Sequence, residues 1–91
     1  MNKDCLADSL ANQFDMDKRT ARKMVNYTLG EIKDAVARGE KVTLVGFGTF
    51  QSKDRAQRTG TNPNSGELIT IPAKRVPTFK PGADFKEAVD R

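Results

Sequence analysis

The chain has 91 residues, a formal net charge of +4 and 36% hydrophobic residues, with one Cys and no His or Trp. This composition excludes an internal disulfide and the usual Cys and His metal sets, and no stretch approaches the roughly 18 apolar residues of a membrane span. We therefore expect one domain over residues 1–91, without metal, cofactor, small-molecule substrate, secretion signal or membrane partner, in a reducing, cytoplasmic compartment.

Two helices are predicted in the first half of the chain. Asn2 is placed to cap the first helix, and Asp17 to cap a second helix that Gly39 ends. The first helix would present Leu6, Leu10 and Phe14 at four-residue spacing. The second would present Ala21, Met24, Val25, Thr28, Leu29, Ile32, Ala35 and Val36. An apolar stripe this wide requires packing partners on two sides of the helix. Because a chain this short can build only a thin hydrophobic core, we expect a second subunit to complete the core.

Short strands should follow. Residues 40–45 alternate as a strand with Val42 and Leu44 pointing inward, and a tight turn at residues 46–48 leads into a second strand. We expect Phe47 and Phe50 to be buried beside this turn. After Pro81, the apolar residues Phe85, Ala88 and Val89 predict a short last helix with one apolar side.

Residues 53–75 read as a long hairpin that projects into solvent as a flexible arm. Residues 59–66 form a cluster rich in Gly, Asn, Ser and Pro, which is a turn signal, with Pro63 and Asn64 at the reversal. Each limb would then have about ten residues, or roughly 33 Å. Pro72 and Pro77 lack the amide of a central ladder and belong at edges or bulges, while Val76 and Phe79 would rejoin the main sheet.

The positive charge is concentrated in this hairpin and its base. Residues 53–80 contain six basic residues and two acidic ones, which accounts for the whole net charge of +4. Charge concentrated in this way is typical of polyanion binders, although a solvated charged loop is the plainer alternative. If the polyanion is DNA, a polar ribbon fits its minor groove, which is about 6 Å wide. The negative potential of that groove attracts Arg and Lys, and such contacts depend little on the base sequence.

The chain resembles the bacterial histone-like proteins of the HU and integration-host-factor family over essentially its whole length. The motifs that carry the resemblance are Gly46-Phe47-Gly48-x-Phe50, Arg55-x-x-Arg58-x-Gly60-x-Asn62-Pro63, Ile71-Pro72-Ala73 and Val76-Pro77-x-Phe79-Lys80-Pro81-Gly82. The resemblance implies an α+β fold in an intertwined homodimer, with a helical base, a small antiparallel sheet saddle and two protruding β-ribbon arms. It also implies a nucleoid protein that bends and compacts double-stranded DNA with low sequence specificity through the minor groove.

Particular residues follow from the charge pattern and the resemblance. Pro63 of each arm would intercalate between base pairs, as apolar wedges of minor-groove architectural proteins do. The DNA-binding residues would be Lys3, Lys53, Arg55, Arg58, Asn62, Pro63, Asn64, Ser65, Lys74, Arg75, Lys80 and Lys86. The dimer core would contain Leu29, Ile32, Leu44, Phe47, Phe50 and Phe79.

The chain departs from the family pattern at three positions. Thr59 and Thr61 stand where many members carry Lys or Arg, and Ala83 stands where a Lys is frequent. Fewer cations release fewer counterions, so we expect weaker binding, and tight binding at high salt is not expected. The preferred form of DNA, whether linear, nicked, bent or four-way, stays open at this stage.

Three alternatives stand beside this interpretation. One is an integration-host-factor-like subunit that pairs with a different chain and prefers certain sequences. Another is a protein-interaction module that uses the ribbon edge for strand addition, against which the clustered charge argues. An enzyme is the weakest, because there is no His to act as a base and no base lies near Cys5 in sequence.

Overall fold

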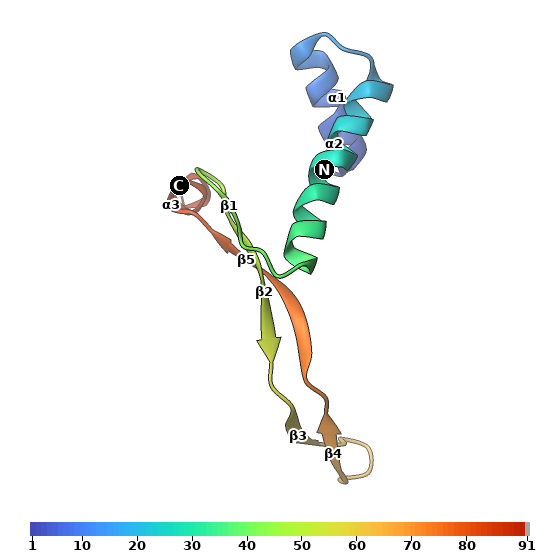
Figure 1. Cartoon of the computed structure of the whole chain (residues 1–91), viewed down its shortest axis with the longest axis vertical. Coiled ribbons are helices and arrows are strands. Elements are labelled where there is room, and N and C mark those ends of the chain that lie inside the picture. The colour runs from blue at the N-terminus through green and yellow to red at the C-terminus, as the bar shows by residue number, and fades with distance from the viewer. Residues whose placement is uncertain (91) are drawn as a thin grey trace. The chain divides into compact units, whose positions relative to one another are not determined.

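The computed structural model describes residues 1–90, so residue 91, the end of the predicted domain, lies outside them. The order of elements is α1 (Lys3–Phe14), α2 (Lys18–Ala37), β1 (Val42–Leu44), β2 (Gly48–Arg55), β3 (Arg58–Thr61), β4 (Leu68–Ile71), β5 (Lys74–Pro81) and α3 (Ala83–Val89) (Figure 1). The fold is α+β, as predicted. The chain divides into two compact units, a helical unit of residues 1–35 and a sheet unit that begins at Val36. None of the described helices is long and apolar enough to cross a membrane.

Both predicted helix caps are present. The Asn2 side chain accepts a hydrogen bond from the Cys5 backbone N–H at 2.9 Å, and the Asp17 carboxylate accepts one from the Thr20 backbone N–H at 2.6 Å. These bonds satisfy backbone donors that the first turn of a helix leaves free. Two residues beyond the end of α2, Gly39 adopts a φ of +90°, a left-handed conformation that glycine adopts without the clash a side chain would cause.

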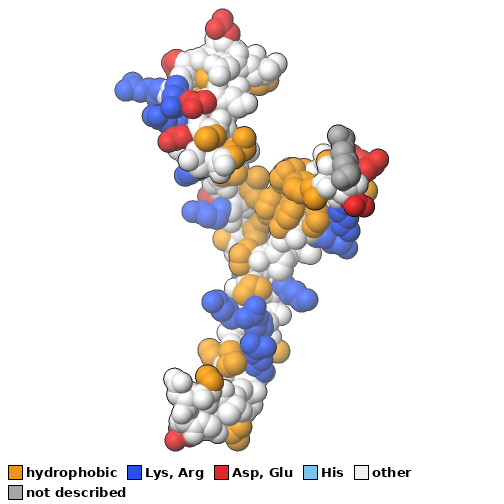
Figure 2. Space-filling view, turned by 180° about the vertical axis from the view of Figure 1, so that it is seen from behind, with side chains coloured by type: hydrophobic (Ala, Val, Ile, Leu, Met, Phe, Trp, Pro, Cys, Tyr) orange, Lys and Arg blue, Asp and Glu red, His pale blue; other side chains and the backbone are white. Residues whose placement is uncertain are grey.

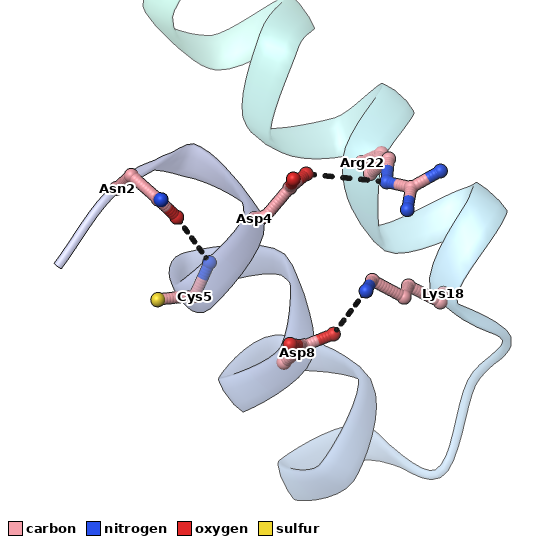
Figure 3. Close-up of polar contacts among 6 residues, drawn as sticks. All are labelled: Asn2, Asp4, Cys5, Asp8, Lys18 and Arg22. Carbon is pink, nitrogen blue, oxygen red and sulfur yellow. Dashed lines mark hydrogen bonds and ion pairs between the residues drawn. The ribbon is translucent and has the colours of Figure 1, made fainter.

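Two ion pairs join α1 to α2 in the helical unit. Asp8 lies 3.0 Å from Lys18 and Asp4 lies 3.3 Å from Arg22, with the acidic partner on α1 in each case (Figure 3). All four side chains are about half exposed or more, so each pair contributes little to stability. They help to set which residues of the two helices lie opposite one another.

The two sheets of the sheet unit are antiparallel. The first has the order β1-β2-β5, and the second contains β3 and β4 (Figure 1). The predicted strand over residues 40–45 is shorter than expected, since β1 covers only Val42–Leu44. Pro77 is confirmed at an edge, because within residues 1–90 β5 pairs with β2 and with no other strand.

Strand pairing along the hairpin of residues 53–75 is interrupted once. The β2–β5 ladder ends at the pair Arg55 and Lys74, and the β3–β4 ladder begins at the pair Arg58 and Ile71. Pro72 lies in this break, where its missing N–H cannot extend the ladder. The predicted turn is also too long, because residues 59–61 belong to β3.

The turn between β1 and β2 brings aromatic rings together. The Phe47 N–H donates to the Leu44 carbonyl at 3.0 Å, and Gly46 adopts a φ of +85°. A Cβ at Gly48 would lie 2.5 Å from a ring carbon of Phe79, so only glycine allows the ring this close to the strand. The last helix is confirmed, with the Phe85 ring centroid 5.2 Å from that of Phe47.

The aromatic cluster consists of Phe47, Phe50, Phe79 and Phe85. Phe50 and Phe79 are cross-strand partners with ring centroids 4.7 Å apart. The expectation that Phe47 is buried is wrong for the single chain, in which it is 44% exposed, and Phe79 is 39% exposed. Three strands and one short helix cover only part of the cluster. Among residues 1–90, the buried hydrophobic side chains are small: Ala7, Ala21, Ala35 and Val36.

The cap at Asp17 makes stability depend on pH. Hydrogen bonds from the Thr20 backbone and side chain lower the pKa of the Asp17 carboxyl below its ordinary value of 3.8. A lowered folded-state pKa stabilises the fold above the unfolded pKa, and this contribution is lost as pH falls through the folded pKa. We expect Asp17→Asn to have a lower Tm than the parent at pH 7, and the difference to vanish in acid. Thermal melts of the parent and the variant from pH 7 to pH 2 test this, and a Tm difference that stays constant over that range would contradict the role of the cap.

Candidate nucleic-acid interface

The β2–β5 ladder sorts side chains by charge. Lys53 pairs with Val76, Arg55 with Lys74, and Thr49 with Lys80. Because alternate residues of a strand point to the same face, these pairs share one face of the sheet. We call Lys53, Arg55, Lys74 and Lys80 the cationic face. Phe50 and Phe79 lie on the opposite face, so the aromatic cluster and the cations do not compete for space.

This register brings together four of the residues predicted to bind DNA. Lys53, Arg55, Lys74 and Lys80 are all exposed. Figure 2 shows Lys and Arg side chains gathered along the middle of the hairpin, while its far end carries mainly uncharged atoms. Arg58 lies further out, opposite Ile71 in the second sheet. The arrangement can neutralise a row of phosphates.

Arg75 does not join the cationic face. It pairs with Asp54 in the ladder, on the opposite face. One guanidinium N–H donates to the Ser52 hydroxyl at 2.8 Å, and Nε lies 3.8 Å from the Asp54 carboxylate. The side chains of Arg75 and Asp54 are 54% and 87% exposed, so water weakens their attraction. Sequence reasoning missed Ser52 and Asp54; strand alternation with the right register would have placed both beside Arg75.

The interruption of the hairpin is also part of this surface. An open hollow of about 350 Å³ lies there, lined by Asp54, Arg55, Ala56, Ala73, Lys74 and Arg75. Its walls hold three cations and one carboxylate. The break in strand pairing therefore falls among the basic residues and not at the uncharged end of the hairpin.

The tip of the hairpin is held by its own hydrogen bonds. The Asn62 N–H donates to the Glu67 carbonyl at 2.8 Å, and the Gly66 N–H donates to the Asn62 carbonyl at 2.7 Å. The Asn62 side chain also accepts from the Asn64 N–H at 2.9 Å, and the Ser65 hydroxyl accepts from the Glu67 N–H at 3.3 Å. Pro63 is exposed within this turn. The predicted reversal at Pro63 and Asn64 is confirmed, and the neighbouring polar side chains hold the turn.

The remaining predicted residues lie on helices. Lys3 begins α1 in the helical unit, whereas Lys86 is in α3 of the sheet unit, and both are exposed. Within residues 1–90 no group of three or more Cys, Asp or Glu side chains is arranged to hold a metal ion. The thiol-bearing residue Cys5 is exposed in the first turn of α1.

Comparison with known proteins identifies the class. Residues 1–90 match the family model described as bacterial DNA-binding protein. The chain is 48% identical over 89 residues to the DNA-binding protein HU of Xylella fastidiosa, an alignment that covers 98% of this chain and 95% of the relative. It is 44% identical to DNA-binding protein HU 1 of Bacillus subtilis, covering 98% and 97% of the two chains.

Solved structures agree. The Anabaena HU chain in a cocrystal with DNA has a TM-score of 0.90 and 45% identity, with 98% of this chain and 97% of that chain covered. HU from Thermotoga maritima has a TM-score of 0.66 and 31% identity, with 98% of each chain covered. The chain therefore belongs to the HU family of bacterial DNA-binding proteins. Members of this family bind DNA and are not enzymes.

The contact between Asp54 and Arg75 yields a prediction about affinity. Asp54→Asn should strengthen DNA binding by about two- to fivefold, because a surface ion pair is worth about 0–1 kcal/mol and its loss frees Arg75. The slope of log affinity against log salt should steepen by up to about 0.9 if Arg75 gains one phosphate. Glu31→Gln, which changes the net charge equally on α2, is the control. Equal effects of the two substitutions in a salt titration would show that only net charge matters.

Proposed function

We propose that this chain is an architectural protein that binds double-stranded DNA through the minor groove with little sequence specificity, and bends and compacts it. The observation that carries the proposal is the cationic face, a row of exposed Lys and Arg along one side of the hairpin. Such a row is complementary to regularly spaced phosphates, whose neutralisation releases counterions and dominates nonspecific affinity. Association with the nucleoid would follow from binding of this kind.

Groove binding is supported by the shape and charge of the hairpin. Two paired strands form a narrow ribbon, and its outer part, residues 59–73, contains no Lys or Arg. The Thr hydroxyls of this outer part can donate to the hydrogen-bond acceptors on the floor of the groove, while Lys53, Arg55, Arg58 and Lys74 lie nearer the phosphates. Lys3, Lys80 and Lys86 would contact DNA that bends back along the body. Asn62, Asn64 and Ser65 would act at the tip, where they also stabilise the turn.

Pro63 is proposed as the wedge that opens a base step. The proposal comes from the family, in which apolar wedges kink DNA, and the exposed position of Pro63 within a hydrogen-bonded turn is compatible with it. Proline has no N–H that would need a partner between bases. Nicked and four-way DNA have already lost stacking at one point, so inserting a wedge there costs less.

A homodimer is proposed because the chain leaves its apolar residues uncovered. Leu29, Leu44, Phe47 and Phe79 are 43%, 37%, 44% and 39% exposed, and Phe50 and Ile32 are partly exposed. These six residues are the predicted dimer core. Exposed apolar groups of this size on so small a chain indicate an interface with another subunit. A second copy would bring two arms to one DNA, whereas pairing with a different chain is the heterodimer alternative.

The dimer proposal predicts that folding and association occur together. The Tm of the purified chain should rise with protein concentration, because mass action stabilises the associated state. Phe79→Ala should lower the Tm by removing a ring that both supports Phe50 and faces the interface. Thermal melts over a wide concentration range and the mass from sedimentation test this. A monomeric mass with a constant Tm would exclude an obligate dimer, and a stable fold only with a paralogue would favour the heterodimer.

The wedge proposal predicts a selective effect of Pro63→Ala. The variant should bind linear DNA almost as well as the parent, but bend it less and lose its preference for nicked or four-way DNA. Unstacking costs a few kcal/mol, which distorted DNA has already met in part. Energy transfer between dyes at the two ends of a duplex measures the bend.

The matched control for the wedge is Ser65→Ala in the same turn. This substitution removes one hydrogen bond of the turn and a polar contact of the tip but keeps the proline, so it should weaken binding while leaving the bend angle of the bound DNA close to that of the parent. If Pro63→Ala weakens binding to every DNA uniformly and leaves the bend angle unchanged, Pro63 is a turn former. The bending would then come from contacts with the body.

A further inference from the structure

The outer part of the hairpin lacks the charge that its base concentrates. We call residues 58–71 the distal arm. Beyond Arg58, its single charged residue is Glu67. The distal arm therefore gains little from phosphate neutralisation, and whatever it contributes to DNA binding must come from hydrogen bonds, apolar contacts and the wedge.

The β3–β4 register gives the distal arm two chemically different faces. Thr59 pairs with Thr70, and Thr61 pairs with Leu68, which places three hydroxyls and one leucine on the same face. All four residues are exposed, Leu68 at 77%. We call this set the hydroxyl face. The other face holds Arg58, Gly60, Ile69 and Ile71, where the Ile71 Cδ1 atom would lie 3.3 Å from a Cβ at Gly60.

We propose that the hydroxyl face lies against the floor of the minor groove and discriminates against the 2-amino group of guanine. The inference rests on the proposed function, because it assumes that the hairpin enters this groove. Every base pair presents acceptors on the minor-groove floor, and Thr hydroxyls can donate to them. On the opposite face, Ile69 and Ile71 have no donor and would leave dehydrated acceptors without partners, while the donor on that face, Arg58, lies next to the pairing break and nearer the phosphates.

Leu68 supplies the discrimination. A G·C pair adds an amino donor to the minor-groove floor, and an A·T pair has none. A hydroxyl can accept a hydrogen bond from this donor, but a leucine side chain cannot. An amino group covered by Leu68 would lose its water without gaining a partner, which is unfavourable. The preference concerns the amino group at the base pair under Leu68 and is compatible with low specificity elsewhere along the DNA.

The experiment uses duplexes that differ only at the minor-groove amino group. Inosine in place of guanine removes the group, and 2,6-diaminopurine in place of adenine adds it, while the major-groove donors and acceptors change little. The full-length protein is titrated with A·T, inosine·C, G·C and diaminopurine·T duplexes at one salt concentration. We expect both amino-free duplexes to bind about tenfold more tightly than both amino-bearing ones.

Two variants locate the effect. Leu68→Thr continues the hydroxyl face on an exposed strand position and should reduce the preference to less than about twofold, because a Thr hydroxyl can accept from the amino group. The salt slope should stay the same, since no charge changes. Val45→Ala removes apolar atoms from a residue that is 98% exposed in the β1–β2 turn, and it should retain the full preference.

The outcomes separate this inference from the proposed function. Equal binding to all four duplexes, or an unchanged preference in Leu68→Thr, would overturn the inference and leave DNA binding intact. A preference that follows base identity, with inosine·C bound like G·C, would overturn it as well. Absence of binding to every duplex would overturn the proposed function itself.

Discussion

The antiparallel pairing of β2 with β5 is the constraint on which the rest of the sheet unit depends. One register places Phe50 opposite Phe79 and, on the other face, Arg55 opposite Lys74. A slip of one residue in either strand would move its cations to the aromatic side and its aromatic ring to the cationic side. The same hydrogen-bond ladder therefore determines both the apolar surface and the charged surface. Gly48 permits this register, because a side chain at that position would collide with the Phe79 ring and the Lys80 carbonyl.

The scarcity of buried side chains explains why two surfaces of such different character occur on so short a chain. A compact monomer of this size would use its phenylalanines for its own core. Here four of the five phenylalanines form a cluster that stays partly open, and the helical unit buries only alanines fully. The free energy gained by burying these rings is large compared with the stabilisation that the exposed ion pairs between α1 and α2 provide. Packing against another chain would thus dominate the stability of the fold.

Local signals in the sequence predicted the helices and the tip correctly. Asn2 and Asp17 act through hydrogen bonds to residues three positions away, and the turn around Pro63 uses partners within five residues. The position of Arg75 away from the cationic face could not be predicted from local signals, because it depends on a hydrogen bond to Ser52, which is 23 residues away in sequence. The break in strand pairing could not be predicted for the same reason. Strand-like composition continues through Ala56 and Pro72, but pairing requires both limbs to offer hydrogen bonds at matching positions.

The division of the hairpin into two ladders agrees with the two roles proposed for it, phosphate contacts along the β2–β5 ladder and a wedge at the tip beyond the β3–β4 ladder. The proposed wedge at Pro63 would have to keep its shape against stacked bases, and the turn around Pro63 is held by several short-range hydrogen bonds. The cationic face on β2 and β5 would instead have to adjust to phosphates whose spacing changes if the DNA bends as proposed. The pairing break lies between these parts, beside Arg55 and Lys74, so a change of angle there would alter the position of the tip without disrupting either ladder. Short-range hydrogen bonds hold the turn and ring contacts hold the aromatic cluster, and the break in strand pairing lies between them.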